Sequence, residues 1–456
     1  MNPEKSFKSR KTNVVDVLNR IVFIALVTLI IVTPIPYGTV EPWWKAAFVC
    51  AVFAICILAL IENLVRGDAV IAGKAILLPM LALAALAFLQ TLSLGSRTAA
   101  NITVWNAISA DPYQTRFFAL QMLALTAFLA LLYRYVNTER RIRVLVYTVL
   151  AIAVTSAVFG ILRQTTQQND LGFVLPLLRR GQGYGQFINK NHFVYLMDMA
   201  FGLGLGIILG GGVKRDRVMV YVAFLLPIWI ALVLANSRGG MLAMIMQVIV
   251  AVLLLTSVPA LSENLQLQQI AQSRLLKTAL LVVLVAGVAL GTIWLGGDRL
   301  VTSLEGVSRE FTTDTARPGV SRNEIWRATL QMFAAHPIAG VGLGGYWIGI
   351  TAYHDASGLM TPQEAHNDYL ELLASGGVIG LALGVWFIVV VVRKTRENLR
   401  ADVGYMRAVR LGAILGLVGV AAHSFVDFGL HILVNAVVFL TLIMMETHPT
   451  ERRTIK

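Results

Sequence analysis

Charged residues are scarce in this chain, and cysteine is nearly absent. Only 14% of the 456 residues are charged, whereas 57% are hydrophobic and the mean hydropathy is +0.71. This composition excludes an ordinary soluble globular protein and indicates a protein that crosses a membrane several times. The only two cysteines, Cys50 and Cys56, fall within one apolar run, so no disulfide framework is expected.

The net charge of +13 does not point to nucleic acid, because no single basic patch is present. The Lys and Arg residues are instead distributed between hydrophobic runs, where they orient a chain in its membrane. We therefore expect membrane lipids as partners, and no nucleic acid. The long hydrophilic segment 298–365 contains five arginines before residue 330 and no lysine. Arginine suits a phosphate ligand because its planar fork binds two oxygens at once, although surface ion pairs with nearby acidic residues are the commoner role of arginines in a mixed-charge loop.

Twelve apolar runs are long enough, or nearly long enough, to cross a bilayer as helices. They cover residues 21–40, 46–61, 75–96, 117–132, 144–162, 191–213, 218–237, 239–260, 278–297, 369–392, 411–425 and 429–445. The first run is too long for the core of a signal peptide, so we expect it to be retained. The sequence thus predicts an all-α polytopic membrane protein with about twelve transmembrane helices.

The runs also suggest an organisation and an orientation. We divide the chain into residues 1–162 with spans 1–5, 163–297 with spans 6–9, the loop 298–368, and 369–456 with spans 10–12 and a tail. Most Lys and Arg residues lie on the side of the N-terminus, which predicts cytoplasmic termini at both ends. The hydrophilic segments 97–116, 163–190 and 298–365 would then lie on the outer side.

Three residues on that outer side are the main candidates for chemistry. His366 lies in a polar cluster that opens the tenth span, where it could exchange protons or simply start a helix. Arg238 interrupts two apolar runs, so it is either an interfacial anchor or a ligand for an anionic headgroup. Arg322 opens an amphipathic helix that a Ser321/Glu324 capping box begins and Pro337 ends, and we expect this helix to lie on the membrane surface.

Several further polar residues lie where lipid would be expected, so they should face the protein interior. Asn191 and His192 open the sixth span and Asp198 lies within it, while His423, Asp427 and His431 cluster at the last outer hairpin. Both catalysis and packing remain open for these residues, and packing is favoured. The glycine-rich stretch 340–345 follows no strand, so it indicates a flexible re-entry turn and not a nucleotide-binding loop.

Taken together, several motifs resemble the bacterial O-antigen ligase and O-antigen polymerase family. They are residues 185–193, Asn236 to Gly239, Arg322 to Trp326, 336–344, and Ala365 to Leu370 with Gly376 and Gly377. The segment 111–116 is similar to a family loop. His423, Asp427, Phe428 and Asn435 resemble the tail of exopolysaccharide polymerase-like members.

The resemblance implies a GT-C-like glycosyltransferase in the bacterial inner membrane. It would move a glycan from an undecaprenyl-diphosphate-linked oligosaccharide to an acceptor sugar hydroxyl at the periplasmic face. His366 would be the catalytic base, and Arg238 and Arg322 would bind the donor diphosphate. Asn367, Asp368, His192, Asn191 and Asp427 are possible supporting residues. The family is metal-independent and inverting, and the outward segments contain no acidic pair spaced like a DxD metal site, so no metal or other cofactor is expected.

The acceptor distinguishes the possible functions. A glycan acceptor makes the protein a polymerase of O-antigen or exopolysaccharide repeat units, which the tail motif favours, whereas a lipid A-core acceptor makes it an O-antigen ligase. A flippase and chain-length regulators are the protein partners that such a pathway implies. A secondary transporter is the alternative from another class, because twelve spans suit one, although its site would be expected near the bilayer midplane.

Overall fold

The computed structural model describes residues 3–67, 72–99, 102–168, 176–257, 321–354 and 361–448. Within these residues, eight helices are long and apolar enough to cross a membrane, judged by length and composition. Three shorter apolar helices cover Lys74–Gln90, Arg238–Leu254 and Leu433–Thr447. The fold is therefore that of an all-α polytopic membrane protein. Eleven of the twelve predicted apolar runs coincide with these helices, and the run 278–297 lies outside the described residues.

Most of the described helices that are neighbours in the sequence are joined by short connections. The longer ones are α1 (Pro3–Val32), α2 (Pro42–Arg66), α3 (Lys74–Gln90), α4 (Pro112–Tyr135), α5 (Glu139–Thr166), α6 (Lys190–Leu209), α7 (Val218–Leu234), α8 (Arg238–Ser257), α11 (Arg322–Ala335), α13 (Asp368–Ala401), α14 (Gly404–His423) and α15 (Leu433–Thr447). Short helical turns are η1 (Arg215–Arg217), α12 (Tyr346–Gly349), η3 (Ile350–Ala352) and η4 (Gly429–His431).

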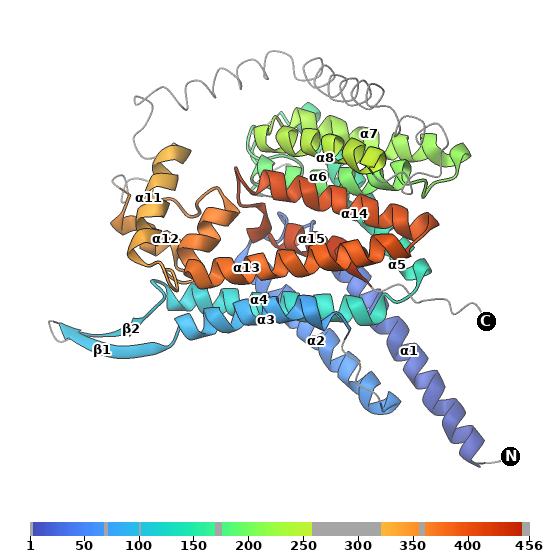
Figure 1. The fold of residues 1–456 in the computed structure, drawn as a ribbon, viewed down its shortest axis with the longest axis horizontal. Coiled ribbons are helices and arrows are strands. Elements are labelled where there is room, and N and C mark those ends of the chain that lie inside the picture. Colours follow the sequence, from blue (N-terminus) through green and yellow to red (C-terminus); the bar gives the residue numbers. More distant parts are fainter. Residues whose placement is uncertain are drawn as a thin grey trace.

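Two boundaries differ from the prediction. The first apolar run was expected to be helical to residue 40, but α1 ends at Val32 because Pro34 and Pro36 follow and cannot continue a helix. The third run was expected to reach residue 96, but α3 ends at Gln90. The chain then forms an antiparallel hairpin of β1 (Ser93–Ala99) and β2 (Ile102–Ala107). This hairpin projects from the helices (Figure 1).

The centre of the bundle is the close packing of α6 against α14. A Cβ on Gly206 would come within 2.3 Å of the Gly412 backbone, and a Cβ on Gly202 within 2.4 Å of the Gly416 backbone. Within each helix the two glycines, Gly202 and Gly206 in α6 and Gly412 and Gly416 in α14, have the spacing of a GxxxG motif. This motif lets two membrane helices approach until their backbones touch. This contact fixes the positions of the first residues of α6 and the last residues of α14, where the site lies.

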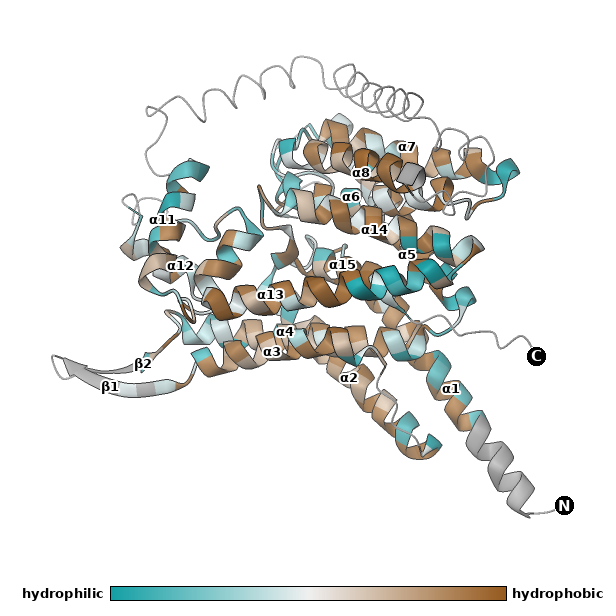
Figure 2. Cartoon of the chain, in the orientation of Figure 1, coloured by the Kyte–Doolittle hydropathy of each residue, from teal (hydrophilic) through white to brown (hydrophobic). Residues whose placement is uncertain are grey.

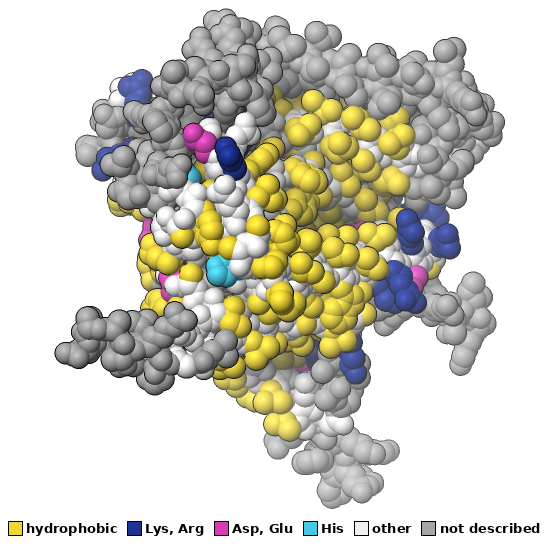
Figure 3. Space-filling view, turned by 60° about the vertical axis from the view of Figure 1, so that its left-hand side comes forward, with side chains coloured by type: hydrophobic (Ala, Val, Ile, Leu, Met, Phe, Trp, Pro, Cys, Tyr) yellow, Lys and Arg dark blue, Asp and Glu magenta, His cyan; other side chains and the backbone are white. Residues whose placement is uncertain are grey.

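The bundle has two different ends. Figure 1 places the hairpin, α11 and α12 at one end, and the first residues of α1 toward the other. The second end holds a buried ionic group in which Arg410 pairs with Asp402 and donates to backbone carbonyls of α15. Between the ends the helices are mostly apolar (Figure 2), and Figure 3 shows a broad hydrophobic surface with charged side chains mainly at its margins. This distribution matches a molecule embedded in lipid.

The helix α13 is interrupted near its beginning. Gly377 has φ 63° and ψ −164°, which is not helical, so backbone groups of Ala374, Ser375 and Val378 lose their partners within the helix. The glycine-rich segment replaces them. Residues 341 and 342 donate to the carbonyls of Ala374 and Ser375, at 3.1 and 3.0 Å, and Val378 donates to the carbonyl of residue 337 at 2.8 Å. A broken membrane helix is tolerated where neighbouring protein satisfies its backbone in this way.

The same contacts correct the expectation of a flexible re-entry turn. A Cβ on Gly340 would lie 2.4 Å from the backbone of Ser375, and one on Gly344 would lie 2.5 Å from the backbone of Gln114. Gln90, from α3, donates to the carbonyls of Ala339 and Ser375 and accepts from the N–H of Leu343. The glycines are therefore required because the segment is packed tightly between α3, α4 and α13.

The helix α11 begins and ends as predicted, but its packing differs. Both halves of the Ser321/Glu324 capping box are present, and the helix ends at Ala335 before Pro337. The residues it buries are Ile325, Ala328, Thr329 and Met332, whereas Leu330 is exposed. The helix packs on α13 and the segment that follows it, because Thr329 hydrogen-bonds the hydroxyl of Tyr346 at 2.7 Å. Its buried face is thus protein-facing and not simply laid on a membrane surface.

Candidate functional site

His366 is held in an uncommon backbone conformation. Its φ of +50° places it in the left-handed region, which few non-glycine residues adopt. The residues on both sides of it are fixed by side chains. The carbonyl of Ala365 accepts from the indole of Trp326 at 2.9 Å, and the N–H of Ala365 donates to Glu371 at 2.8 Å. Asn367 caps α13 by accepting from the N–H groups of residues 369 and 370.

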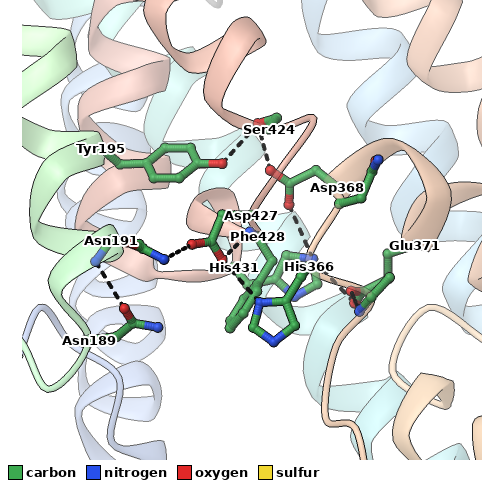
Figure 4. Close-up of polar contacts among 12 residues, drawn as sticks. Asn189, Asn191, Tyr195, His366, Asp368, Glu371, Ser424, Asp427, Phe428 and His431 are labelled. Carbon is green, nitrogen blue, oxygen red and sulfur yellow. Dashed lines mark hydrogen bonds and ion pairs between the residues drawn. The ribbon is translucent and has the colours of Figure 1, made fainter. Parts of the chain in front are cut away.

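The same junction is joined to the turn after α14. The N–H of Asp368 donates to the carbonyl of Ser424 at 3.0 Å, and the hydroxyl of Ser424 donates to the Asp368 carboxylate at 2.6 Å. Asn367 donates to the carbonyl of Phe425 at 3.0 Å. Asn367 and Asp368 therefore hold the backbone beside His366. Figure 4 shows the carboxylate of Asp368 directed toward Ser424.

The ring of His366 is oriented by Asp427, which lies between α14 and η4. His366 Nδ1 is 3.4 Å from Asp427 Oδ1, and the amide of Asn191 donates to Asp427 Oδ2. The N–H of Phe428 also donates to this carboxylate, at 2.9 Å. His366 is 36% exposed, whereas Asp427 is 1% exposed, so the buried carboxylate holds a ring that remains accessible. Figure 4 shows this chain from Asn191 through Asp427 to His366.

Electrostatics favour an ionised Asp427. Burial alone would raise the pKa of its carboxyl group, but the hydrogen bond with His366 and the charges of nearby histidines lower that pKa to about 2. The carboxylate is therefore charged at physiological pH and can accept the Nδ1–H of His366. That arrangement leaves Nε2 of His366 as the nitrogen able to take a proton from a substrate.

His192 supports the site by packing. Its ring meets the ring of Phe428 edge to face, with centroids 4.9 Å apart, and the ring of His366 meets the same phenyl group at 4.9 Å. The carbonyl of His192 accepts from Asn435 at 3.0 Å. Phe428 thus separates the two imidazoles and limits the positions that His366 can take.

A small cleft of about 80 Å³ lies beside this network, and both candidate arginines line it. Its lining residues are Lys190, Asn191, Asn236, Arg238, Gly239, Arg322, His423, Val426 and Asp427. The arginines come from the first turns of α8 and α11, where backbone N–H groups also favour an anion. Lys190 is fixed by donating to the carbonyl of Asn236 at 2.8 Å. Three cationic side chains and one carboxylate, itself already hydrogen-bonded, make a site suited to a small polyanion.

The structure therefore brings together residues that are far apart in the sequence. Arg238, Arg322, Asn191 and Asp427 share the cleft, and His366 joins it through Asp427. The expected cluster of His423, Asp427 and His431 lies at the end of α14 and in the turn between α14 and α15, and each of the three residues pairs with a residue outside the cluster. His423 pairs with Asp198 at 2.9 Å, Asp427 with His366, and His431 lies 3.5 Å from Glu371.

Sequence reasoning did not select Lys190 as a site residue and did not predict the contact that Glu371 makes. Lys190 follows Asn189, the residue that caps α6, and a lysine placed at a helix start within an outer loop gives only a weak signal. Glu371 lies one turn after Asn367, and its contact with the N–H of Ala365 becomes visible only once the backbone of His366 is known. Both depend on tertiary contacts.

The fold and the cleft define a class: a multi-spanning membrane protein with a cationic, histidine-containing site at one end of its helix bundle. Residues 221–385 match the model of the family described as O-Antigen ligase, a range that contains Arg238, Arg322 and His366. Over this range the chain is similar to the O-antigen ligase family. A search among curated proteins found no match to the chain.

Proposed function

We propose that the protein is an inverting, metal-independent glycosyltransferase that polymerises O-antigen or exopolysaccharide repeat units at the periplasmic face of a bacterial inner membrane. The donor is an oligosaccharide linked to undecaprenyl diphosphate, and the acceptor is a sugar hydroxyl of another repeat unit. The observation that carries the proposal is the convergence of Arg238, Arg322 and Lys190 on one cleft with Asp427, the partner of His366.

The cleft would hold the two phosphates of the donor. Arg238 and Arg322 would bind phosphate oxygens and stabilise the negative charge that grows on the diphosphate as the C1–O bond of the sugar breaks. The position of the cleft at the end of the helices suits a lipid-linked donor, because its headgroup would sit at the bilayer surface while its tail remains in lipid.

His366 would act on the acceptor. Its Nε2 would take the proton of the acceptor hydroxyl as that oxygen attacks C1 from the face opposite the diphosphate, which inverts the configuration at C1. Asp427 would accept the Nδ1–H of His366 and stabilise the imidazolium that forms. The proton then leaves with solvent, and the carrier diphosphate leaves with the electron pair of the broken bond.

Transfer by single variants in membranes of matched expression tests the proposal. We expect His366→Ala, Arg238→Ala and Arg322→Ala each to lower the rate of glycan transfer by about 10²-fold or more, because each removes the base or a charge-stabilising contact. His336→Ala is the matched control, because this exposed histidine follows the last residue of α11 and does not line the cleft. Full transfer by His366→Ala would remove the base assignment.

An O-antigen ligase is the second candidate, favoured by the description of the matching family. The acceptor would then be lipid A-core, while the donor and the roles of the three residues would be the same. Gel profiles of a deletion strain distinguish the two functions. Loss of a polymerase leaves single repeats on their acceptor, whereas loss of a ligase leaves polymer that is not attached to lipid A-core.

A further inference from the structure

A second histidine–carboxylate pair lines the same cleft, and the mechanism above does not use it. His423 ends α14, and its Nδ1 lies 2.9 Å from Oδ2 of Asp198 in α6. His423 is 1% exposed and Asp198 is completely buried. Tyr195 stacks on the His423 ring at 4.0 Å with an interplanar angle of 19°, so the ring has a fixed orientation.

Among the described residues, His423 Nε2 is buried and makes no hydrogen bond. Gly239, the residue after Arg238, packs against that edge of the ring, because a Cβ at this glycine would lie 2.7 Å from Nε2. The unpartnered nitrogen therefore lies beside the segment that places Arg238 in the cleft.

The protonation of the pair follows from its burial. A carboxylate beside a neutral imidazole would carry one net negative charge, and a net charge is costly where neither side chain reaches water. A pair without net charge holds one proton more. The proton between Nδ1 and the Asp198 carboxyl group can then belong to either residue, and in both cases Nε2 of His423 carries a hydrogen. The charged or titratable groups around the ring are Asp198, Tyr195, His192, Lys190, Arg238, Arg322 and Asp427.

Lys190, Arg238 and Arg322 would by themselves favour the form of the pair that has lost this proton and carries a negative charge. A bound diphosphate reverses that preference, because its two negative charges offset the cations and attract a proton on Nε2. An N–H that is buried and unpaired in the cleft gains most from an anionic acceptor.

We propose that His423 donates a hydrogen bond from Nε2 to a phosphate oxygen of the donor, as a diphosphate ligand additional to the two arginines. Asp198 is the positioning residue that fixes the ring for this contact. The inference rests on the proposed function, since it assumes that the cleft receives the donor diphosphate.

Two complementary substitutions separate the contact from the fold. Asn at position 423 places an amide near the position of Nδ1 and can still bond Asp198, but it leaves no donor near Nε2. Gln places its amide nitrogen near the position of Nε2 and keeps a donor in the cleft. Gly239→Ala keeps both residues of the Asp198–His423 pair but puts a methyl group 2.7 Å from Nε2, too close for an undisturbed contact, so it displaces or covers this edge of the ring.

The probe is a short-chain dialkyl diphosphate, in which each phosphate keeps one negative charge, and its Kd is measured by calorimetry on the full-length protein in detergent. We expect His423→Asn and Gly239→Ala each to raise the Kd about tenfold or more, and His423→Gln to raise it less than about threefold. His336→Gln should bind as the wild type does. Melting temperatures confirm that each variant is folded.

The outcomes are distinct. If the folded wild type does not bind the probe, the proposed function fails, and this inference fails with it. If the wild type binds and Arg322→Ala weakens binding, but His423→Asn and Gly239→Ala bind like the wild type, the proposed function stands and the contact from His423 is overturned. Gly239→Ala alone decides the matter if the substitutions at position 423 do not fold.

Discussion

Asp427 is the residue that joins the two parts of the site. It lines the cleft with the arginines and also contacts the ring of His366. Its carboxylate receives further hydrogen bonds from Asn191 and the N–H of Phe428, which stabilise the charged form. Because it is buried, its protonation state affects stability as well as chemistry.

The first prediction concerns the pH dependence of stability. The pKa of Asp427 in the folded protein, about 2, is below the ordinary value of about 3.9. Its stabilisation, on the order of 2 kcal/mol, is therefore fully present above about pH 4 and is lost only as the pH falls through about 2. We expect Asp427→Asn to lower the melting temperature in detergent at least as much at pH 5 as at pH 8.

Glu364 provides a control, because its effect on stability should change with pH in the opposite direction to that of Asp427. Burial, and then the charge of Glu371, raise the pKa of Glu364 above its usual value, so its ionised form destabilises the fold as the pH rises. Glu364→Gln should therefore raise the melting temperature relative to the wild type more at pH 8 than at pH 5. A loss in Asp427→Asn that shrinks toward pH 5 would show that this carboxyl group titrates in that range.

Candidate residues could be selected from the sequence, but their pairing could not. A histidine at a membrane edge and an arginine between two apolar runs single out His366 and Arg238 as candidates, whereas Arg322 was selected from the first turn of an amphipathic helix. Their roles came from the family resemblance. Which carboxylate orients His366 could not be predicted. Asp368 is near in sequence but contacts Ser424, whereas Asp427 reaches the ring only because α13 is joined to the turn after α14.

The broken helix α13 is the element that positions this junction. Its first turn holds the residues next to His366, and the interruption at Gly377 receives the segment that connects α11 to α12. The site therefore depends on packing contacts at both ends of the first part of α13, residues 368–377. One is the turn at Ser424 and the other is the glycine-rich segment.

The second prediction tests that dependence. In Gly377→Ala the new Cβ would lie 2.2 Å from the carbonyl oxygen of Ile338, at backbone angles that essentially only glycine adopts. We expect a loss of about 3 kcal/mol or more in stability, seen as a lower melting temperature and a lower yield of folded protein. Gly384→Ala is the control on the same helix, because its Cβ would meet only the end of a leucine side chain. Equal melting temperatures for the wild type and Gly377→Ala would contradict the observed break.

Element type was the most predictable feature at this scale. Hydrophobic length identified the membrane helices, and the capping box together with Pro337 marked both ends of α11. The role of the glycines at 340–345 was not predictable, because glycine is equally consistent with a mobile turn and with tight backbone packing. Only the contacts with α3, α4 and α13 distinguish these cases.

At the scale of the whole molecule, the two ends of the bundle differ in chemistry. The site end holds the cleft, the hairpin and α11. The opposite end holds Arg134 and Arg141, and the final residues of α13 and α15. The charge pattern of the sequence anticipated this division, since it placed the long hydrophilic segments on one side and most Lys and Arg residues on the other. The packing of the helices within the bundle was not predictable from apolar runs alone, because lipid-facing and protein-facing sides are equally hydrophobic.

The third prediction is the orientation of these ends in the membrane. Ala110 is an exposed residue at the site end, and Val403, 73% exposed, precedes α14 at the opposite end. In a background with Cys50 and Cys56 replaced by alanine, each position is changed to cysteine in turn. A membrane-impermeant maleimide added to cells with a permeabilised outer membrane should label Ala110→Cys and leave Val403→Cys unlabelled until the inner membrane is lysed.

The labelling result bears directly on the donor. The proposed donor, an undecaprenyl-diphosphate oligosaccharide that has been flipped, would present its headgroup to the periplasm, so only a cleft on that side could bind it. Glycan transfer by both cysteine variants verifies that the labelled molecules are active. Labelling of Val403→Cys in intact cells, with Ala110→Cys protected, would place Arg238, Arg322 and His366 on the cytoplasmic side and would be incompatible with a periplasmic polymerase or ligase.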